Sequence, residues 1–379
     1  MTQPADPEVS LWRFYAYFLR LGASGFGGPI ALAGFMQRDL VEERRWVSSE
    51  DYVDGLALAQ LAPGPLAAQL AMYLGYVRGG LVGATIVALL FVLPSFLMVW
   101  GISVAYVRFG GLPWMQALFY GIGSSVIGII ARSAFKLTRL TIGKSRLLWS
   151  IFAVMALSTA WTEREIVWLF LFAGGLTMLL ARKAPAGAMA LLAGLGPAHL
   201  PAAAAPTLST LFWFFAKAGA FVFGSGLAIV PFLYGEVVST QGWLDDRQFL
   251  DAVAVAMITP GPVVITVAFI GYLVAGPWGM TAAALGVFLP VYLFVLIPAP
   301  YFRRHRSQPA VKAFVDGVTA AATGAIAGAA YVLATRAIID FWTASIAVAT
   351  FALLTRFKIS ELWLIGAAGA LGLAIRAGG

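Results

Sequence analysis

Two basic residues, Arg20 and Lys217, lie inside long apolar stretches of the sequence, and each comes two residues before a glycine, Gly22 or Gly219. A charge inside a membrane is costly, so both residues are candidates for function. Two cations at one site would bind a divalent anion. Alternatively, each long side chain could extend to the membrane surface and serve only as an anchor.

Two Pro-Gly-Pro segments, Pro63-Gly64-Pro65 and Pro260-Gly261-Pro262, interrupt two further apolar stretches. Proline removes a backbone donor and clashes with the preceding turn, so neither stretch can form one helix. We expect four short helices instead, over residues 52–61, 66–77, 251–258 and 263–274. The free N–H groups that open the second helix of each pair would favour an anion in the middle of the membrane. Broken helices at matching places in two halves are typical of a transporter's central site, although Pro-Gly-Pro could also simply kink a packed helix.

Polar side chains near these breaks are further candidates for hydrogen bonds to an oxyanion: Gln60, Gln69, Thr259, Thr266, Ser24 and Ser225. They could equally satisfy the backbone groups that broken helices leave without partners. Two acidic residues, Asp54 and Asp251, are candidates for proton coupling, because a partly buried carboxylate can titrate near neutral pH. Both follow residues typical of helix N-caps, which favours a structural role at the start of a helix.

The composition is that of a helical integral membrane protein. Of the 379 residues, 61% are hydrophobic and only 11% are charged, whereas a soluble protein carries about 25% charged residues. The net charge of +8 comes from short basic clusters between apolar stretches, which is typical of topology signals and gives no reason to expect nucleic acid as a partner. With no cysteine and two histidines outside these stretches, we expect neither a metal site nor a cofactor.

The chain contains an internal repeat. An offset of 197 residues maps Pro63-Gly64-Pro65 onto Pro260-Gly261-Pro262, Asp54 onto Asp251 and Arg20 onto Lys217, and an offset of 196 continues the match further along. We therefore predict a first membrane repeat over 1–183, a linker over 184–206 and a second membrane repeat over 207–379.

Basic residues predict that the two repeats have inverted topology. The loop richest in Lys and Arg follows the fourth apolar stretch in the first repeat, but it precedes the equivalent stretch in the second repeat. Because Lys and Arg mark the cytoplasmic side, the two repeats should cross the membrane in opposite directions. If each Pro-Gly-Pro pair enters and returns on one side, the all-α protein has about 10 spans plus two re-entrant hairpins. The alternative has 13 spans, with each broken pair crossing once and the linker crossing as well. The first apolar stretch, 11–35, counts as one membrane helix in both.

Three further motifs are Phe26-Gly27-Gly28-Pro29, the loop Arg44-Arg45-Trp46, and Thr259-Pro260-Gly261-Pro262. With these motifs the sequence resembles the chromate ion transporter family over essentially the whole chain. The resemblance implies a multi-pass protein of the bacterial inner membrane that exports chromate, confers chromate resistance and uses the proton-motive force. It also implies functional roles for Arg20, Lys217 and both Pro-Gly-Pro segments. The second repeat departs from the pattern, since Met257 stands where the first repeat has Gln60.

Other functions stay open at this point. A carrier for sulfate or a related oxyanion would need the same cationic site, because sulfate has the shape and charge of chromate. An oxyanion channel and an intramembrane enzyme are weaker alternatives, and the sequence has no metal-ligand or nucleophile constellation that an enzyme would need. There is no phosphate-binding loop of the Walker type, so ATP is not the expected energy source. The expected partners are the oxyanion, coupling protons and the lipid bilayer, and a homodimer is compatible with the sequence.

Overall fold

The computed structural model describes residues 10–26, 28–109, 112–143, 145–162, 167–180, 207–221, 229–300, 309–357 and 359–377. Every regular element in these ranges is helical. The first repeat contains α1 (Leu11–Ser24), α2 (Gly28–Met36), the π-helical segment η1 (Gln37–Glu43), α3 (Ser49–Leu61), α4 (Leu66–Phe109), α5 (Pro113–Thr141), α6 (Arg146–Thr162) and α7 (Val167–Leu180).

The second repeat contains the same series of elements. They are α9 (Leu208–Phe221), α10 (Ile229–Leu233), the π-helical segment η3 (Tyr234–Thr240), α11 (Asp246–Ile258), the 3-10 turn η4 (Val263–Ile265), α12 (Thr266–Leu296), α14 (Pro309–Ala337), α15 (Phe341–Arg356) and α16 (Glu361–Ala377). The bounds of η1 and η3, and those of α3 and α11, differ by the 197 residues found in the sequence. The chain therefore repeats in structure as well as in sequence.

Each Pro-Gly-Pro segment separates two helices, as predicted. In the first repeat, α3 ends at Leu61 and α4 begins at Leu66. The two helices fold back on each other, because a Cβ placed on Gly55 of α3 would lie 3.1 Å from a side-chain atom of Leu70 and would also touch Tyr73. This hairpin is the geometry that the prediction of re-entrant pairs requires.

A second reversal lies inside α4 and recurs inside α12. The backbone leaves helical geometry at Gly79 and Gly80, and equivalently at Ala275 and Gly276. Gly75 and Gly83 touch across the first reversal, since a Cβ on Gly75 would lie 2.7 Å from the carbonyl oxygen of Gly83. Eight residues of straight helix would separate them by about 12 Å, so α4 consists of two helices, 66–78 and 81–109.

The first apolar stretch differs from its prediction as one helix. It breaks after Ser24, and α2 and η1 turn back along α1. Tyr17 of α1 donates a hydrogen bond to Asp39 of η1 over 3.2 Å, and the space beside Gly25 is filled by Leu32. The physical reason is the run of glycines from Gly25, which favours loop over helix. The number of membrane crossings stays a prediction, because this stretch forms a hairpin.

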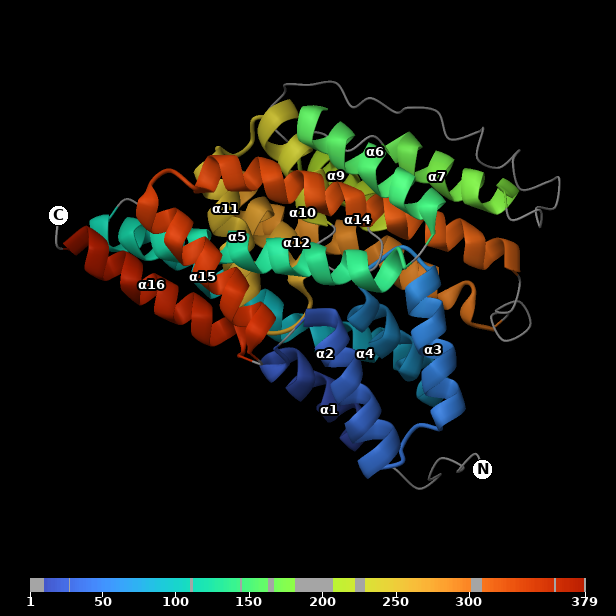
Figure 1. The fold of residues 1–379 in the computed structure, drawn as a ribbon. Helices are drawn as coiled ribbons and strands as arrows, with labels where there is room; N and C mark the ends of the chain where they lie inside the picture. Colours follow the sequence, from blue (N-terminus) through green and yellow to red (C-terminus); the bar gives the residue numbers. More distant parts are fainter. Residues whose placement is uncertain are drawn as a thin grey trace.

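Equivalent helices of the two repeats run in opposite directions. In Figure 1, α5 runs from left to right and α14 from right to left. The contacts agree: α5 lies parallel to α15, with Tyr120 bonded to Asp340 near both starts and Ser125 bonded to Thr350 further along. Since α15 returns after α14 through three residues, α14 opposes α5.

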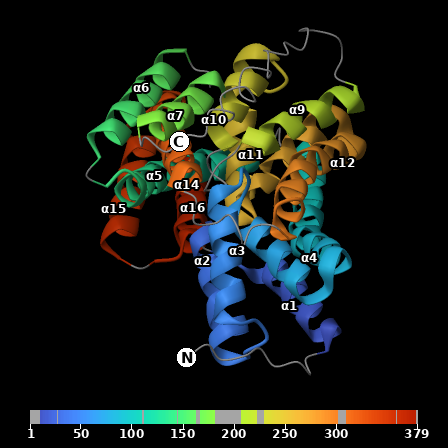
Figure 2. The same cartoon turned by 90° about the vertical axis from the view of Figure 1, so that its right-hand side faces the viewer.

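The two repeats are interlocked rather than side by side. Helix α5 of the first repeat packs on α15 and α16 of the second, and α14 packs on α6 and α7 of the first (Figures 1 and 2). Glycines allow the close approach: a Cβ on Gly128 would lie 2.5 Å from the carbonyl oxygen of Ala347, and one on Gly328 would lie 2.5 Å from that of Ala156.

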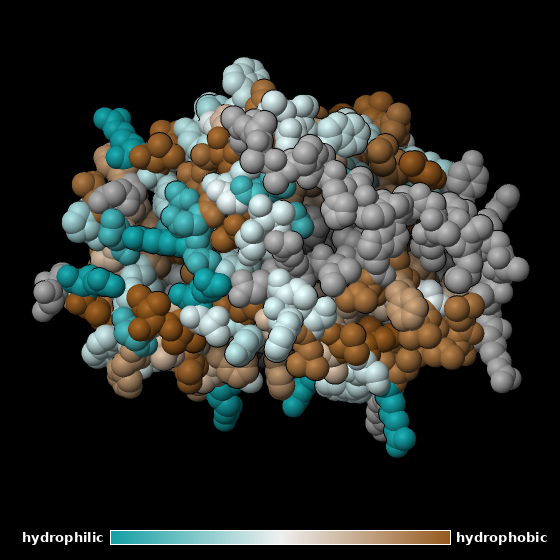
Figure 3. All heavy atoms as spheres, turned by 90° about the horizontal axis from the view of Figure 1, so that it is seen from above, coloured by the Kyte–Doolittle hydropathy of each residue, from teal (hydrophilic) through white to brown (hydrophobic). Residues whose placement is uncertain are grey.

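The outer surface fits a lipid environment. In the described part of the chain, four helical segments are long and apolar enough to cross a membrane by length and composition: 66–109, 113–136, 263–296 and 312–337. Two of them, 66–109 and 263–296, include the reversals at Gly80 and Gly276. Shorter apolar helices accompany these segments. Large exposed leucines line α4 and recur at equivalent places on α12: Leu89, Leu93, Leu97, Leu285, Leu289 and Leu293. In Figure 3, hydrophobic residues cover much of the visible face and hydrophilic ones gather toward its left end. The protein is a polytopic helical membrane protein.

Candidate functional site

The second Pro-Gly-Pro segment lies against the first repeat. The backbone N–H of Gly261 donates to the carbonyl oxygen of Gly25 over 2.9 Å. The hydroxyl of Ser95, on α4, donates to the carbonyl oxygen of Pro260 over 2.6 Å. Gly261 has a φ of +97°, and a Cβ there would overlap the hydroxyl oxygen of Ser95. Only glycine fits this conformation and this contact.

The first Pro-Gly-Pro segment makes the matching contact with the second repeat. Gly64 has a φ of +139°, and a Cβ there would lie 3.1 Å from the side chain of Val291 on α12. Gln69, which is fully buried, donates from Nε2 to the carbonyl oxygen of Pro63 over 2.6 Å. Both breaks therefore lie where the repeats meet. The Nε2 donor of Gln69 is bonded to the backbone of the first break, rather than directed toward a ligand.

The first backbone N–H groups of α4 have no partner within the helix itself. Gln69 makes the first main-chain hydrogen bond of the helix, to Pro65, over 3.1 Å. The N–H groups of Leu66, Ala67 and Ala68 precede that bond, as at every helix start, and these residues are buried. The second repeat differs, because the 3-10 turn η4 comes before α12 and the Thr266 hydroxyl donates to Val263.

Arg20 lies at the end of α1 in an open pocket of about 350 Å³ between α1 and the returning α2–η1 segment. The pocket is lined by Tyr17, Arg20, Leu21, Ser24, Gly25, Phe35, Arg38, Asp39, Glu43 and Arg44. Arg20 is exposed there, and Ser24 turns its hydroxyl back to the Arg20 carbonyl oxygen. Through Gly22 and Gly25, the other side of the same helix end touches Ser95 and Gly261.

The other two arginines of this pocket have different surroundings. Arg38 forms ion pairs with Asp39 at 2.8 Å and with Glu43 at 3.6 Å. Arg44 instead stacks on aromatic rings, with its Cζ 4.7 Å from the centre of the Trp46 ring and 5.6 Å from that of Tyr17. Stacking on two rings orients a guanidinium while its N–H groups stay available.

Lys217 does not line the Arg20 pocket. It is half-buried on α9, which packs on α12. Gln60 is exposed at the end of α3, and the Thr259 hydroxyl donates to Val255. Ser225 lies outside the described residues. Arg20 and Ser24 are thus together, whereas the structure does not bring Lys217 to the same cavity.

The two acidic candidates are both buried near the starts of their helices. Asp54 is fully buried in α3, whose N-cap is Ser48. Asp251 is 4% exposed and accepts a hydrogen bond of 2.6 Å from the hydroxyl of Tyr106, at the end of α4 of the other repeat. A buried carboxylate that accepts a hydrogen bond from a tyrosine has the chemistry of a proton acceptor.

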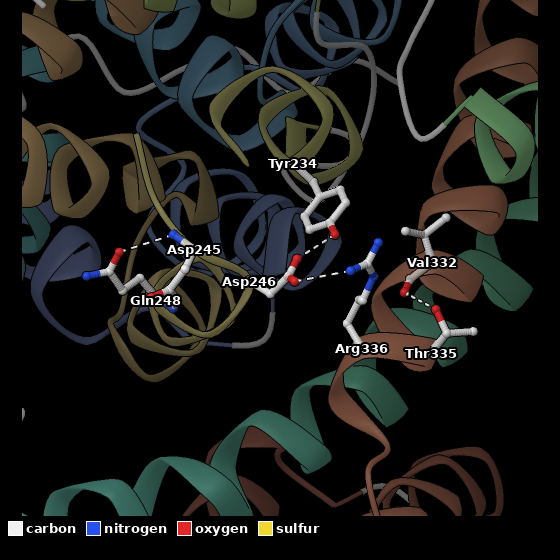
Figure 4. Close-up of polar contacts among 7 residues, drawn as sticks. All are labelled: Tyr234, Asp245, Asp246, Gln248, Val332, Thr335 and Arg336. Carbon is white, nitrogen blue, oxygen red and sulfur yellow. Dashed lines mark hydrogen bonds and ion pairs between the residues drawn. The ribbon is translucent and has the colours of Figure 1, made fainter. Parts of the chain in front are cut away.

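Asp251 also borders a larger cavity of about 770 Å³ between α5, α11, α14 and α16. Three arginines line it: Arg247, Arg336 and Arg376. Figure 4 shows Asp246 between Tyr234 and Arg336; the tyrosine hydroxyl donates to it over 2.6 Å and the guanidinium lies 3.3 Å away. The neighbouring Asp245 caps α11 and pairs with Gln248 (Figure 4).

Sequence reasoning did not single out Ser95, Tyr17, Arg44 as a pocket residue, or Tyr106. Ser95 follows Pro94, whose repeat equivalent is Pro290, so the matched prolines were the one sequence signal near Ser95. Contacts between helices distant in sequence give no local signal. Within the part of the chain that the structure describes, no three His, Asp or Glu side chains gather as a metal site would require.

Taken together, the fold and site define a polytopic membrane protein of two inverted repeats, each with a broken helix that meets the other repeat. A family model described as "Chromate transporter" matches residues 12–179 and 209–373. The chain belongs to the chromate transporter family.

Similar proteins carry matching names. A "Chromate transport protein" of Cupriavidus metallidurans is 58% identical over 97% of this chain and 94% of its own length. A "Probable chromate transport protein" of Synechococcus elongatus is 56% identical over 94% and 92%, and a "Chromate transport protein" of Pseudomonas aeruginosa is 34% identical over 86% and 81%. No solved structure gives a significant match.

Proposed function

We propose that the protein is a secondary active transporter that exports chromate across the bacterial inner membrane and thereby confers chromate resistance. The observation that carries this proposal is the contact of each Pro-Gly-Pro break with the opposite repeat, beside the arginine-lined pocket of α1. In transporters with inverted repeats, substrate sites lie at the repeat interface beside broken helices. Rocking of one repeat against the other would then open the site to each side in turn.

The Arg20 pocket supports an oxyanion as the substrate. Chromate is a tetrahedral dianion, and guanidinium groups bind such oxygens through charge-assisted hydrogen bonds. Arg20 is exposed in the pocket, Arg44 is held by stacking, and Ser24 lies beside them. The buried N–H groups at the start of α4, near Gly64, would add positive potential deeper in the protein. Lys217 is proposed to act on the second repeat's side of the pathway.

Proton coupling would fit the buried carboxylates. Asp251, bonded to Tyr106, borders a cavity that contains three arginines. A proton on this carboxylate would remove a negative charge from the cavity, and the presence of a dianion nearby would favour that protonation. Asp54 is the equivalent group of the first repeat. A sulfate carrier is the second candidate, because the same pocket chemistry suits both dianions.

The test uses everted membrane vesicles from a chromate-sensitive bacterium that expresses the chain. We expect accumulation of labelled chromate that stops when the proton gradient is dissipated. Arg20→Ala should abolish it, whereas Arg13→Ala, an exposed arginine on the same helix outside the pocket, should leave it unchanged. Chromate accumulation that continues after the proton gradient is dissipated would contradict transport driven by that gradient. Preferential accumulation of sulfate over chromate would favour the second candidate.

A further inference from the structure

The two Pro-Gly-Pro breaks have equivalent backbone carbonyls, and both accept a hydrogen bond from a side chain of the first repeat. In the second break, the carbonyl oxygen of Pro260 accepts from Ser95 of the first repeat over 2.6 Å. In the first break, the equivalent oxygen, on Pro63, accepts from Gln69 of its own repeat, also over 2.6 Å. Proline interrupts helical bonding at both places, so each carbonyl needs such a donor.

The repeat register explains the difference residue by residue. The equivalent of Ser95 is Val291, which touches Gly64 but has no donor to offer. The equivalent of Gln69 is Thr266, whose hydroxyl is too short to cover the same distance and donates to Val263 instead. Both donors therefore belong to the first repeat: Ser95 reaches across to the second break, and Gln69 bonds within the first break. The loss of a donor at one position is matched by a longer side chain at the other.

The different donors at the two breaks have a mechanical consequence. The second break is tied to the first repeat by the hydrogen bond from Ser95 to the Pro260 carbonyl oxygen. At the first break, the Pro63 carbonyl is satisfied within its own repeat, and among the described residues the counterpart of Ser95, Val291, makes an apolar contact with Gly64. An apolar contact can slide, whereas a buried hydrogen bond must break before the groups can separate.

We propose that Ser95 is a positioning residue that fixes the second Pro-Gly-Pro break to the first repeat, and that the Gln69 bond leaves the first break free to move against the second repeat during transport. The inference rests on the proposed function, because the movement serves alternating access. It adds that the two breaks, although related by the repeat, have unequal roles: the second is an anchor and the first is the moving element.

Stability measurements on purified protein test the donor exchange without any transport. Gln69→Leu should lower the thermal stability by leaving the Pro63 carbonyl buried without a partner. Adding Val291→Ser should restore the stability, because the introduced hydroxyl would occupy the place that Ser95 has in the second break. In the reverse exchange, Thr266→Gln should rescue Ser95→Val. Failure of both rescues would overturn the equivalence of the two donors.

Transport measurements test the unequal roles. Val291→Ser alone would tie the first break to the second repeat, so we expect the maximal rate to fall about fivefold, the effect of one net hydrogen bond, with KM and thermal stability preserved. The doubly substituted Ser95→Val, Thr266→Gln chain should be stable but lose the anchor, and its maximal rate should fall as well. Wild-type rates in both chains would overturn the proposal.

A third readout separates this inference from the proposed function. The native chain has no cysteine, so Ser24→Cys gives a single label site in the Arg20 pocket, and its maleimide reaction rate reports how often the pocket opens. Val291→Ser in that background should slow the labelling even in a preparation that moves no chromate. An unchanged labelling rate would contradict the moving first break, whereas absence of chromate transport in the wild-type chain would contradict only the proposed function.

Discussion

Arg44 is held in the pocket by stacking on two aromatic rings, and the second repeat has no arginine at the equivalent position. Its equivalent is Gln241, and the equivalents of Tyr17 and Arg38 are Phe214 and Gly235. The two arginines that accompany Arg20 in its pocket therefore have no basic counterpart in the second repeat. A transporter that moves its substrate in one direction can use such a difference between repeats, because the two faces of the protein then bind the anion unequally.

Arg44→Gln, which installs the second repeat's residue, should raise the KM for chromate about tenfold, the loss expected for one hydrogen bond to a charged group. The maximal rate should change little if Arg44 acts in initial binding. Arg44→Lys keeps the charge but loses the planar stacked group, so it should give an intermediate KM. Initial rates of chromate uptake into everted vesicles measure both constants. An unchanged KM in Arg44→Gln would exclude Arg44 from the site.

At the scale of residues, the sequence predicted candidates better than their partners. Arg20 was identified because a charge in an apolar stretch is unusual, and the structure places it beside Ser24 in an open pocket. Its neighbours Arg44 and Tyr17 come from a hairpin that no local pattern indicated. Lys217 was paired with Arg20 by the repeat register, yet equivalence in a repeat does not require two side chains to share a cavity.

At the scale of elements, the breaks could be predicted and the folding back of the first stretch could not. Proline excludes a continuous helix by its own covalent geometry, so both Pro-Gly-Pro breaks fall where the sequence indicates. Glycine only weakens a helix, and many apolar stretches with glycine stay helical in membranes. The reversal after Ser24 depends on contacts such as Tyr17 with Asp39, which join residues of two elements.

The glycine of the second break, Gly261, combines a left-handed backbone with a close contact to another helix. Gly261→Ala would force a side chain into a left-handed backbone with a φ of +97° and into the Ser95 hydroxyl. We expect a loss of roughly 2–3 kcal/mol in unfolding free energy from backbone strain and overlap together, with transport lost.

The matched control for this substitution is Gly101→Ala. Gly101 lies within α4, and a Cβ there would meet no atom within 4 Å. Alanine is the better helix former, so the change should be neutral or stabilising by up to about 1 kcal/mol. Thermal unfolding of the two purified variants in one detergent compares them directly. Equal stability would show that the contact between Gly261 and Ser95 is absent in the membrane protein.

At the scale of the whole molecule, helices of one predicted repeat pack on helices of the other, as α5 does on α15 and α16. The inverted relation follows from basic residues on opposite sides of equivalent helices, and the opposed directions of α5 and α14 agree with it. The interlocking was not predictable, because the apolar faces of α6, α7, α15 and α16 would serve equally well in packing within one repeat.

The interlocked helices predict how a divided chain behaves. A fragment ending at residue 183 would leave the glycine face of α5 without α15 and α16, and a fragment starting at 207 would leave α14 without α6 and α7. Each fragment alone should therefore be degraded in the membrane. When both are produced together, the exposed faces can pair, so we expect the fragments to purify as one complex and to restore chromate resistance. Membrane abundance, co-purification through a tag on one fragment, and growth in chromate measure the three results. Stable, separately purified halves would show that each repeat packs on itself, and the contacts between the Pro-Gly-Pro breaks and the opposite repeat would then lose their basis.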